Sequence, residues 1–118
     1  MKRDMKYLCL VYLAPDKMHA VPDRECQACG EGLQKNGLLI AAEALEPVDT
    51  ATTVRVRNGR MSITDGPFAE TKEQLAGFYL IEARDLNDAI QVAARIPPAR
   101  EGSIEVRPVR QLDPEKYV

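Results

Sequence analysis

The sequence has no surplus of positive charge, and this scarcity removes one large class of function. Its 118 residues include 16 Lys and Arg against 18 Asp and Glu, which gives a formal net charge of −2. Binding along a nucleic-acid backbone needs a surplus of basic side chains to neutralise phosphates, so nucleic-acid binding is not expected. No glycine-rich phosphate loop follows a predicted strand either, and nucleotide binding therefore has no support.

Long apolar runs are also missing. The apolar residues 7–14 follow basic residues as in a signal peptide, but this run is short, ends at Pro15 and has no small-x-small cleavage site. No stretch approaches the length of a membrane span, so no membrane partner is expected. The three cysteines are an odd number in a chain long enough to fold without disulfides, which predicts a reducing, cytoplasmic location. Met5 is an equally good start for the folded part, so residues 1–4 are expected to be a frayed leader.

What is present is one domain with alternating strand and helix patterns. Runs of apolar residues bounded by turn signals predict strands at residues 6–14, 38–45, 75–83 and 103–109. The first three have apolar side chains on both faces, which is typical of buried strands. A helix is predicted over residues 22–36, beginning at Pro22 and burying Cys26, Cys29 and Leu33. Asp85 caps a second helix with apolar positions at Leu86, Ala89, Ile90, Ala93 and Ile96.

A β-hairpin is predicted around Asn58-Gly59, the strongest short-range signal for a two-residue type I′ turn. The turn sets the register, which pairs Arg57 with Arg60 and continues to Thr52 opposite Asp65. The apolar pairs then share one face, and the other face holds the arginines Arg55, Arg57 and Arg60. This arginine face either points into solvent or attracts an anionic partner.

The order β-α-β, hairpin, β-α-β predicts an α+β domain: a ferredoxin-like split βαβ sheet with an inserted β-hairpin. Two helices cover only one face of a four-stranded sheet. Because three strands are apolar on both faces, the uncovered face would be too large an apolar patch for a soluble monomer. A second copy, packed sheet against sheet in a two-fold homodimer, covers it most simply.

Asp65-Gly66-Pro67-Phe68 opens a stretch that resembles the signature of the YCII-related family, specifically its DGPF subgroup. The similar stretch runs on to Tyr79, and further matches lie at residues 5–8, 82–86 and 105–109. The resemblance implies a ferredoxin-like domain over residues 5–112, followed by a tail at 113–118, in a dimeric α/β barrel-like assembly. Most members have no known function, and some are encoded beside or fused to extracytoplasmic-function sigma factors. The broader superfamily is suggested to hold a His-Asp pair in a cleft.

Asp65 is the first candidate for chemistry. It is either a general base or ligand-holding carboxylate at the mouth of a cleft, or it only builds the turn before Gly66. His19, the lone histidine, either exchanges a proton near neutral pH or is a surface residue. Tyr12 either points into a dimer cleft, with its hydroxyl free to bind substrate, or is a residue of the core or of an interface. Glu70 and Lys72 either hold a polar ligand or lie in a solvated loop.

Cys26 and Cys29 form a C-x-x-C pair that suits either a redox site or half of a zinc site. Redox pairs usually begin a helix directly after a strand, and zinc needs four ligands, of which only His19 is nearby in the sequence. We therefore interpret the thiols as structural and expect no metal or other cofactor.

Two functions remain open. In the first, the homodimer is a binding protein, or an enzyme of proton transfer, for a small polar metabolite in a cleft, with Asp65 and His19 as catalytic candidates. Tyr12, Glu70 and Lys72 are then its binding candidates. In the second, the protein is a non-enzymatic binding or regulatory module linked to a sigma factor.

Overall fold

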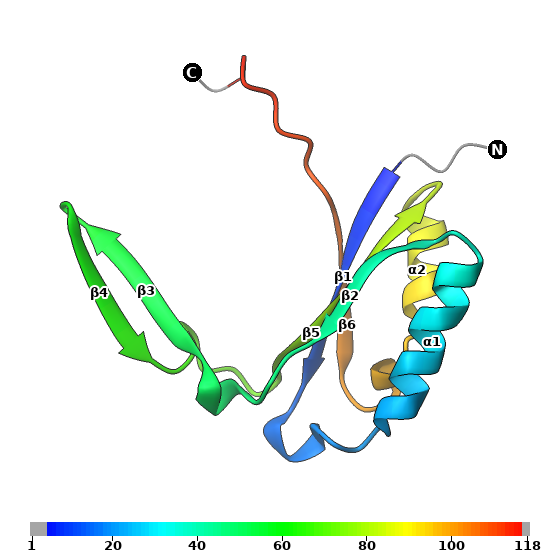
Figure 1. Ribbon diagram of the computed structural model, residues 1–118, viewed down its shortest axis with the longest axis horizontal. Coiled ribbons are helices and arrows are strands. Elements are labelled where there is room, and N and C mark those ends of the chain that lie inside the picture. The colour runs from blue at the N-terminus through cyan, green and yellow to red at the C-terminus, as the bar shows by residue number, and fades with distance from the viewer. Residues whose placement is uncertain (1–4, 117–118) are drawn as a thin grey trace.

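Four strands hydrogen-bond in one antiparallel sheet, and two more form a separate hairpin (Figure 1). The computed structural model describes residues 5–116. The strands are β1 (Met5–Leu13), β2 (Leu39–Ala44), β3 (Thr52–Arg57), β4 (Arg60–Asp65), β5 (Gln74–Ala83) and β6 (Ser103–Pro108). The helices are α1 (Asp23–Lys35) and α2 (Leu86–Ala93), with short 3₁₀ helices η1 (Pro15–Lys17), η2 (Val48–Thr50) and η3 (Pro97–Arg100).

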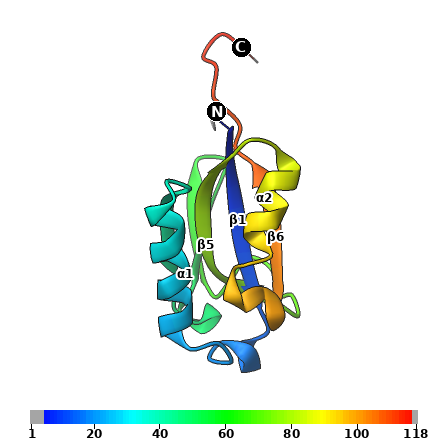
Figure 2. The same cartoon turned by 90° about the vertical axis from the view of Figure 1, so that its right-hand side faces the viewer.

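The four-stranded sheet has the order β2-β5-β1-β6, and all of its neighbouring strands are antiparallel. Each βαβ unit is therefore split by a strand of the other unit, as the sequence order predicted. Both helices lie on the same face of the sheet (Figure 2). The arrangement is α+β and compatible with a ferredoxin-like fold.

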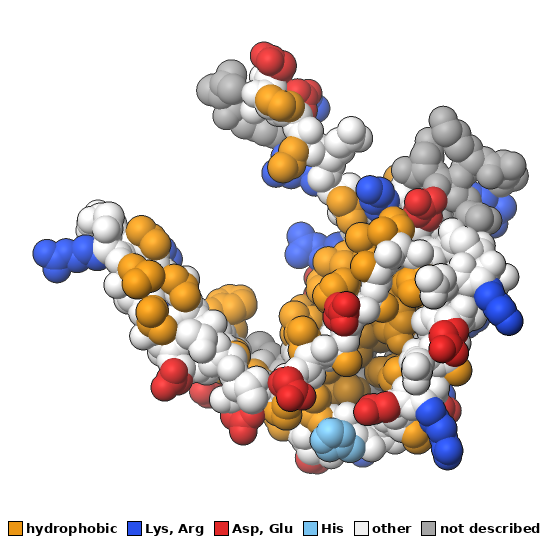
Figure 3. Space-filling view, viewed as in Figure 1, with side chains coloured by type: hydrophobic (Ala, Val, Ile, Leu, Met, Phe, Trp, Pro, Cys, Tyr) orange, Lys and Arg blue, Asp and Glu red, His pale blue; other side chains and the backbone are white. Residues whose placement is uncertain are grey.

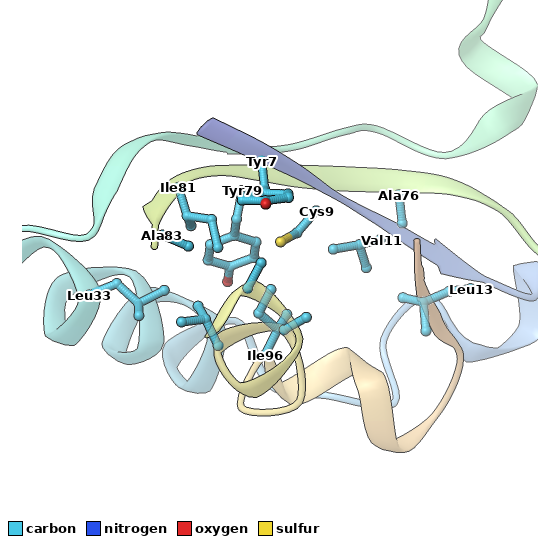
Figure 4. Close-up of a cluster of buried hydrophobic side chains, with 13 residues drawn as sticks. Tyr7, Cys9, Val11, Leu13, Leu33, Ala76, Tyr79, Ile81, Ala83 and Ile96 are labelled. Carbon is cyan, nitrogen blue, oxygen red and sulfur yellow. The ribbon is translucent and has the colours of Figure 1, made fainter. Parts of the chain in front are cut away.

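The core lies between the helices and the sheet (Figure 4). Alternate residues of β1 point into it, and Cys9 is fully buried, as is Ile81 of β5. Leu33 is the buried residue of α1, and Cys29 packs against the core, as the predicted helix stripe requires. The opposite face of β1, with Leu8, Leu10 and Tyr12, is only half-buried because no helix covers it.

Helix α2 has its predicted cap and most of its predicted stripe, because Ala89, Ala93 and, just after the helix, Ile96 are buried. The Asp85 carboxylate accepts a hydrogen bond of 2.8 Å from the Asp88 backbone N–H, which is an N-cap. Leu86 and Ile90, expected to be inward, are 51% and 46% exposed. The buried side chains of the helix are Ala89, Val92 and Ala93. The helix is short and lies near the β6 side of the sheet, so only a narrow stripe of small residues meets the strands (Figure 2).

The hairpin β3–β4, which we call the arm, has the predicted turn and register. Asn58 and Gly59 have φ of 52° and 75°, as a type I′ turn requires, and Arg57 pairs with Arg60. Pairing continues without a shift to Thr52 opposite Asp65. The arm stands away from the four-stranded sheet (Figure 1).

Residues 1–4, the expected leader, lie outside the described residues. In the described part of the chain, no helix has the length and apolar character needed to cross a membrane.

Candidate functional site

A groove of about 600 Å³ runs between α1 and the part of the sheet formed by β2 and β5. Its lining comes from distant parts of the sequence, including Leu13 of β1, Leu39 of β2 and Tyr79 of β5. Figure 3 shows the hollow with hydrophobic side chains inside it and acidic side chains around its edge.

The groove is hollow because small residues line it. Gly30 of α1 faces the sheet, and a Cβ atom there would lie 3.9 Å from the Leu39 side chain and 4.0 Å from that of Tyr79. These are ordinary contact distances, so the missing side chain at Gly30 leaves space that a larger residue would fill. Ala42 and Ala76 line the same space with single methyl groups. The groove is therefore hollow because the residues at these positions are small.

Acidic residues dominate the polar part of the groove. Apart from the Cys26 thiol and the Tyr79 phenol, the ionisable side chains that line it are those of His19, Asp23, Glu31, Glu43 and Glu46. No Lys or Arg is among the lining residues. All five side chains belong to exposed residues, so they keep their contact with water while bordering an apolar floor. The local potential therefore favours a positively charged group over a negatively charged one.

Tyr79 ties the wall of the groove to α1. Its hydroxyl donates a hydrogen bond of 3.2 Å to the Cys26 carbonyl oxygen in the first turns of the helix. Burial, followed by the neighbouring thiols of Cys29 and Cys26, raises the pKa of Tyr79 far above its usual range. The phenol is therefore protonated at neutral pH and acts as a donor. This contact holds β5 and α1 at a fixed separation and keeps the groove open.

The two thiols of α1 are poor nucleophiles. Burial raises the pKa of Cys26, with smaller contributions from Asp23, Cys29 and Glu25, while Arg100 acts in the opposite direction. Burial also raises the pKa of Cys29, whose Sγ donates to the Arg95 carbonyl oxygen at 3.8 Å. The reactive thiolate form is therefore scarce at neutral pH. Within residues 5–116, no three His, Cys, Asp or Glu side chains come together as a metal site would need.

The chain matches a known protein family over most of its length. The YCII-related domain matches residues 5–113. The chain belongs to the YCII-related family. An uncharacterized protein of Rhizobium meliloti (strain 1021) is 40% identical over 93 residues, which are 77% of this chain and 75% of that protein. Neither description states a ligand or a reaction.

In this YCII-related domain, the predicted site residues lie in four separate places. His19 lies on the groove, after η1, and shares its lining with Asp23, the first residue of α1. Asp65 ends β4 at the root of the arm, where it is exposed and is not among the residues that line the groove. Glu70 and Lys72 are exposed in the loop that leads from the arm to β5. A single chain does not bring Asp65 and His19 into one cavity.

Tyr12 lies on the sheet face that the helices leave open. It pairs with Ser103 of β6, whose Oγ donates to the Glu73 carboxylate at 2.7 Å. Partial burial raises the pKa of Tyr12, and the Glu105 carboxylate, to which its hydroxyl donates, raises it further; Arg107 opposes both effects. Tyr12 thus belongs to a small polar cluster at one end of the open face and not to the groove.

Sequence reasoning missed most of the groove. The sequence patterns did not single out Asp23, Glu43 or Glu46. One signal was available: Glu43 is the only charged residue in the apolar run Leu39–Ala44. The glycines of α1 were a second signal, because Gly30 costs helix stability that its place beside the groove explains.

Proposed function

We propose that this YCII-related protein binds a small molecule with an apolar body and a positively charged or hydrogen-bond-donating group. The observation that carries the proposal is the composition of the groove, which combines an apolar floor with four carboxylates and a histidine, and has no lysine or arginine. A volume of about 600 Å³ lies within the usual range of small-molecule sites, about 300–1,000 Å³. The sequence predicted a polar metabolite; the floor favours one that is also partly apolar.

The two parts of the groove supply different contributions. The apolar floor, which includes Leu13, Leu39 and Tyr79, provides affinity through burial of the ligand's apolar surface. The carboxylates, which include Glu43 and Glu46, orient the ligand and select its charge. They are exposed, so their attraction is modest and weakens as salt is added.

Proton-transfer chemistry at the same site would use His19. A histidine changes protonation near neutral pH, and His19 lies on the groove where a bound ligand would be within its reach. Tyr79 is not a base at neutral pH because its pKa is raised. Asp65 stays a candidate only if a second copy brings its carboxylate to the groove or to another cleft.

The assembly proposed for this function is a homodimer formed through the open face of the sheet. Apolar side chains cover this face on both central strands: Leu8 and Leu10 on β1, Phe78 and Leu80 on β5. A face of this kind on a stable soluble protein is usually covered by another surface. The Asp65-Gly66-Pro67-Phe68 corner supports membership of the DGPF subgroup. The sigma-factor module remains the alternative function if the groove binds no ligand.

The test uses two probes of matched size and opposite charge, 2-phenylethylamine and 3-phenylpropionate. We expect the amine to shift the amide signals of groove residues in two-dimensional NMR, with an affinity at least fivefold higher than that of the acid and a gap that narrows at 0.5 M NaCl. The variant Gly30→Leu should abolish binding, because its side chain fills the space beside Leu39 and Tyr79.

Gly32→Leu is the matched control. It lies on the same helix, and a Cβ atom there would have no neighbour within 4 Å, so the variant should bind the amine as the parent does. Equal affinity for both probes would contradict the proposed charge selection. Binding of neither probe, or equal binding by the two leucine variants, would remove the groove as the ligand site.

A further inference from the structure

The arm exposes an apolar face that its own chain does not cover. Val54 pairs with Ile63, and Val56 pairs with Met61, so these four side chains share one face of the arm. They are 57%, 59%, 60% and 66% exposed, and every residue of β4 is exposed. An isolated two-stranded hairpin is at best marginally stable in water. An arm of this composition therefore needs a surface to pack against.

The arm does not use its own sheet as that surface, because it stands away from it (Figure 1). The Gly66 N–H donates to the Ala51 carbonyl oxygen at 2.7 Å, and the Thr53 hydroxyl donates to the Gly66 carbonyl oxygen at 2.8 Å. These bonds close the base of the hairpin where it leaves the body of the molecule. Hydrophobic side chains lie along the arm and on the side of the body that is nearest to it (Figure 3).

The size of the exposed surface points to an extensive partner. The chain exposes 8,832 Å², whereas a monomer of its mass normally exposes about 6,400 Å². Its radius of gyration is 16.4 Å, against about 13.5 Å for a compact domain of this length. The segment after β6 contributes part of this excess. The remainder still leaves room for the 800 Å² or so that each partner buries in a standard interface.

We propose that the arm is a dimerisation arm, whose apolar face packs on the open sheet face of a second copy. The open face offers the matching surface, with Leu10 and Phe78 side by side on paired strands, and it too is uncovered in a single chain. In a two-fold dimer, one contact is made twice, so both arms and both open faces become covered together. No other partner is needed to cover these surfaces. This inference extends the proposed homodimer and does not depend on the ligand of the groove.

The first test compares two double variants of the arm. Each replaces one cross-strand residue pair by a Thr-Thr pair, and the two pairs are neighbours along the strands. Val56→Thr with Met61→Thr changes the apolar face, and Arg55→Thr with Ser62→Thr changes the opposite face. Sedimentation velocity over a concentration series should show a dimer for the parent. We expect the first variant to raise the dimer dissociation constant at least tenfold and the second to change it less than threefold. Far-UV circular dichroism checks that both keep the parent's strand content.

The second test uses single replacements, so it does not depend on whether the double variants of the arm fold. A photo-crosslinking residue replaces Met61 in one protein and Thr64, on the opposite face of the arm, in a second protein. Each protein is prepared as an equal mixture of ¹⁴N- and ¹⁵N-labelled chains. Mass spectrometry should find links from position 61 to β1 or β5 peptides of the other isotope, and few from position 64. A monomeric parent, equal dissociation constants for the two double variants, or links from position 61 only within one chain would overturn the proposal. A parent dimer with unlinked arms would leave the sheet-face dimer standing and reject the arm contact.

Discussion

Asp65 has two roles open to it at the scale of a single residue. It ends β4 opposite Thr52 and precedes Gly66, whose φ of +100° is open to glycine but costly for other residues. This is the corner that turn chemistry predicts. By strand alternation the Asp65 carboxylate also shares the face of Val54 and Ile63, so the proposed arm contact would bring it to the partner.

The variant Asp65→Asn separates these roles. Asparagine bonds the backbone at the same offset and tolerates the same dihedral angles, so a turn-building Asp65 is replaced at a cost well under about 1 kcal/mol in unfolding free energy. A working carboxylate loses its charge instead, and ligand affinity or turnover falls about tenfold or more, which is about 1.4 kcal/mol. Urea unfolding and amine binding, measured on the same samples, decide between the two. Unfolding of the variant would contradict both roles.

Cys9 makes a prediction about alkaline stability. Burial raises the pKa of its thiol from 9.0 to about 11. Below pH 9 the thiol is protonated in both the folded and the unfolded chain, and the full contribution to stability is present. Between pH 9 and 11 the unfolded chain loses this proton first, so the free energy of unfolding falls as pH rises, by up to about 2 to 3 kcal/mol from this group.

The measurement is urea unfolding at pH 8 and pH 10.5 for the parent and for Cys9→Ala. The variant is less stable at pH 8, because it leaves a small cavity in the core, but it should lose less stability than the parent at high pH. Tyr79 and the thiols of α1 add to the loss in both proteins, so the difference between parent and variant isolates Cys9. An equal loss in the two would show that the Cys9 thiol ionises as readily in the folded chain as in the unfolded one.

At the scale of elements, the close approach of β2 to β5 depends on Gly77. A Cβ atom at this position would lie 2.8 Å from the Glu43 carbonyl oxygen and 3.3 Å from the Ala44 Cα atom. Both neighbours are backbone, so neither moves without disturbing the strand pairing. β2 also carries Glu43 and borders the groove, which makes this pairing important for the site as well as for the fold.

Gly77→Ala should therefore lower the free energy of unfolding by about 1 to 3 kcal/mol, the usual range for overpacking a tight site. Gly32→Ala is the control, because its Cβ atom would meet nothing within 4 Å and alanine favours a helix by about 1 kcal/mol. Thermal and urea unfolding compare the two with the parent. A neutral Gly77→Ala would mean that β2 and β5 separate without cost at this point.

At the scale of the whole molecule, a single chain leaves two apolar surfaces uncovered, on the arm and on the open sheet face. The core itself lies on the helix side and is complete within one chain. The core of the βαβ units can therefore form within one chain, whereas the two open surfaces are covered only by a partner. The proposed dimer covers both surfaces, and it leaves the groove accessible if the partner stays on the arm side of the sheet.

The sequence by itself determined the order and type of the strands and α-helices, the register of the arm and the apolar character of the second sheet face. These follow from local rules: apolar periodicity defines strands and helices, and Asn58-Gly59 admits only one kind of tight hairpin. In α2 the apolar pattern was too broad to show which residues face the core. The packing decided that Leu86 and Ile90 are exposed.

Only the tertiary structure decided where a site could be. The sequence placed interest on Asp65, Glu70 and Lys72 because polar residues gather there, yet the groove joins His19 with residues of α1, β2 and β5 that are far apart in the chain. No local pattern reports that Gly30 of α1 lies beside Leu39 of β2 and Tyr79 of β5. A cavity is an absence of atoms between non-local neighbours, and such an absence exists only once the chain has folded.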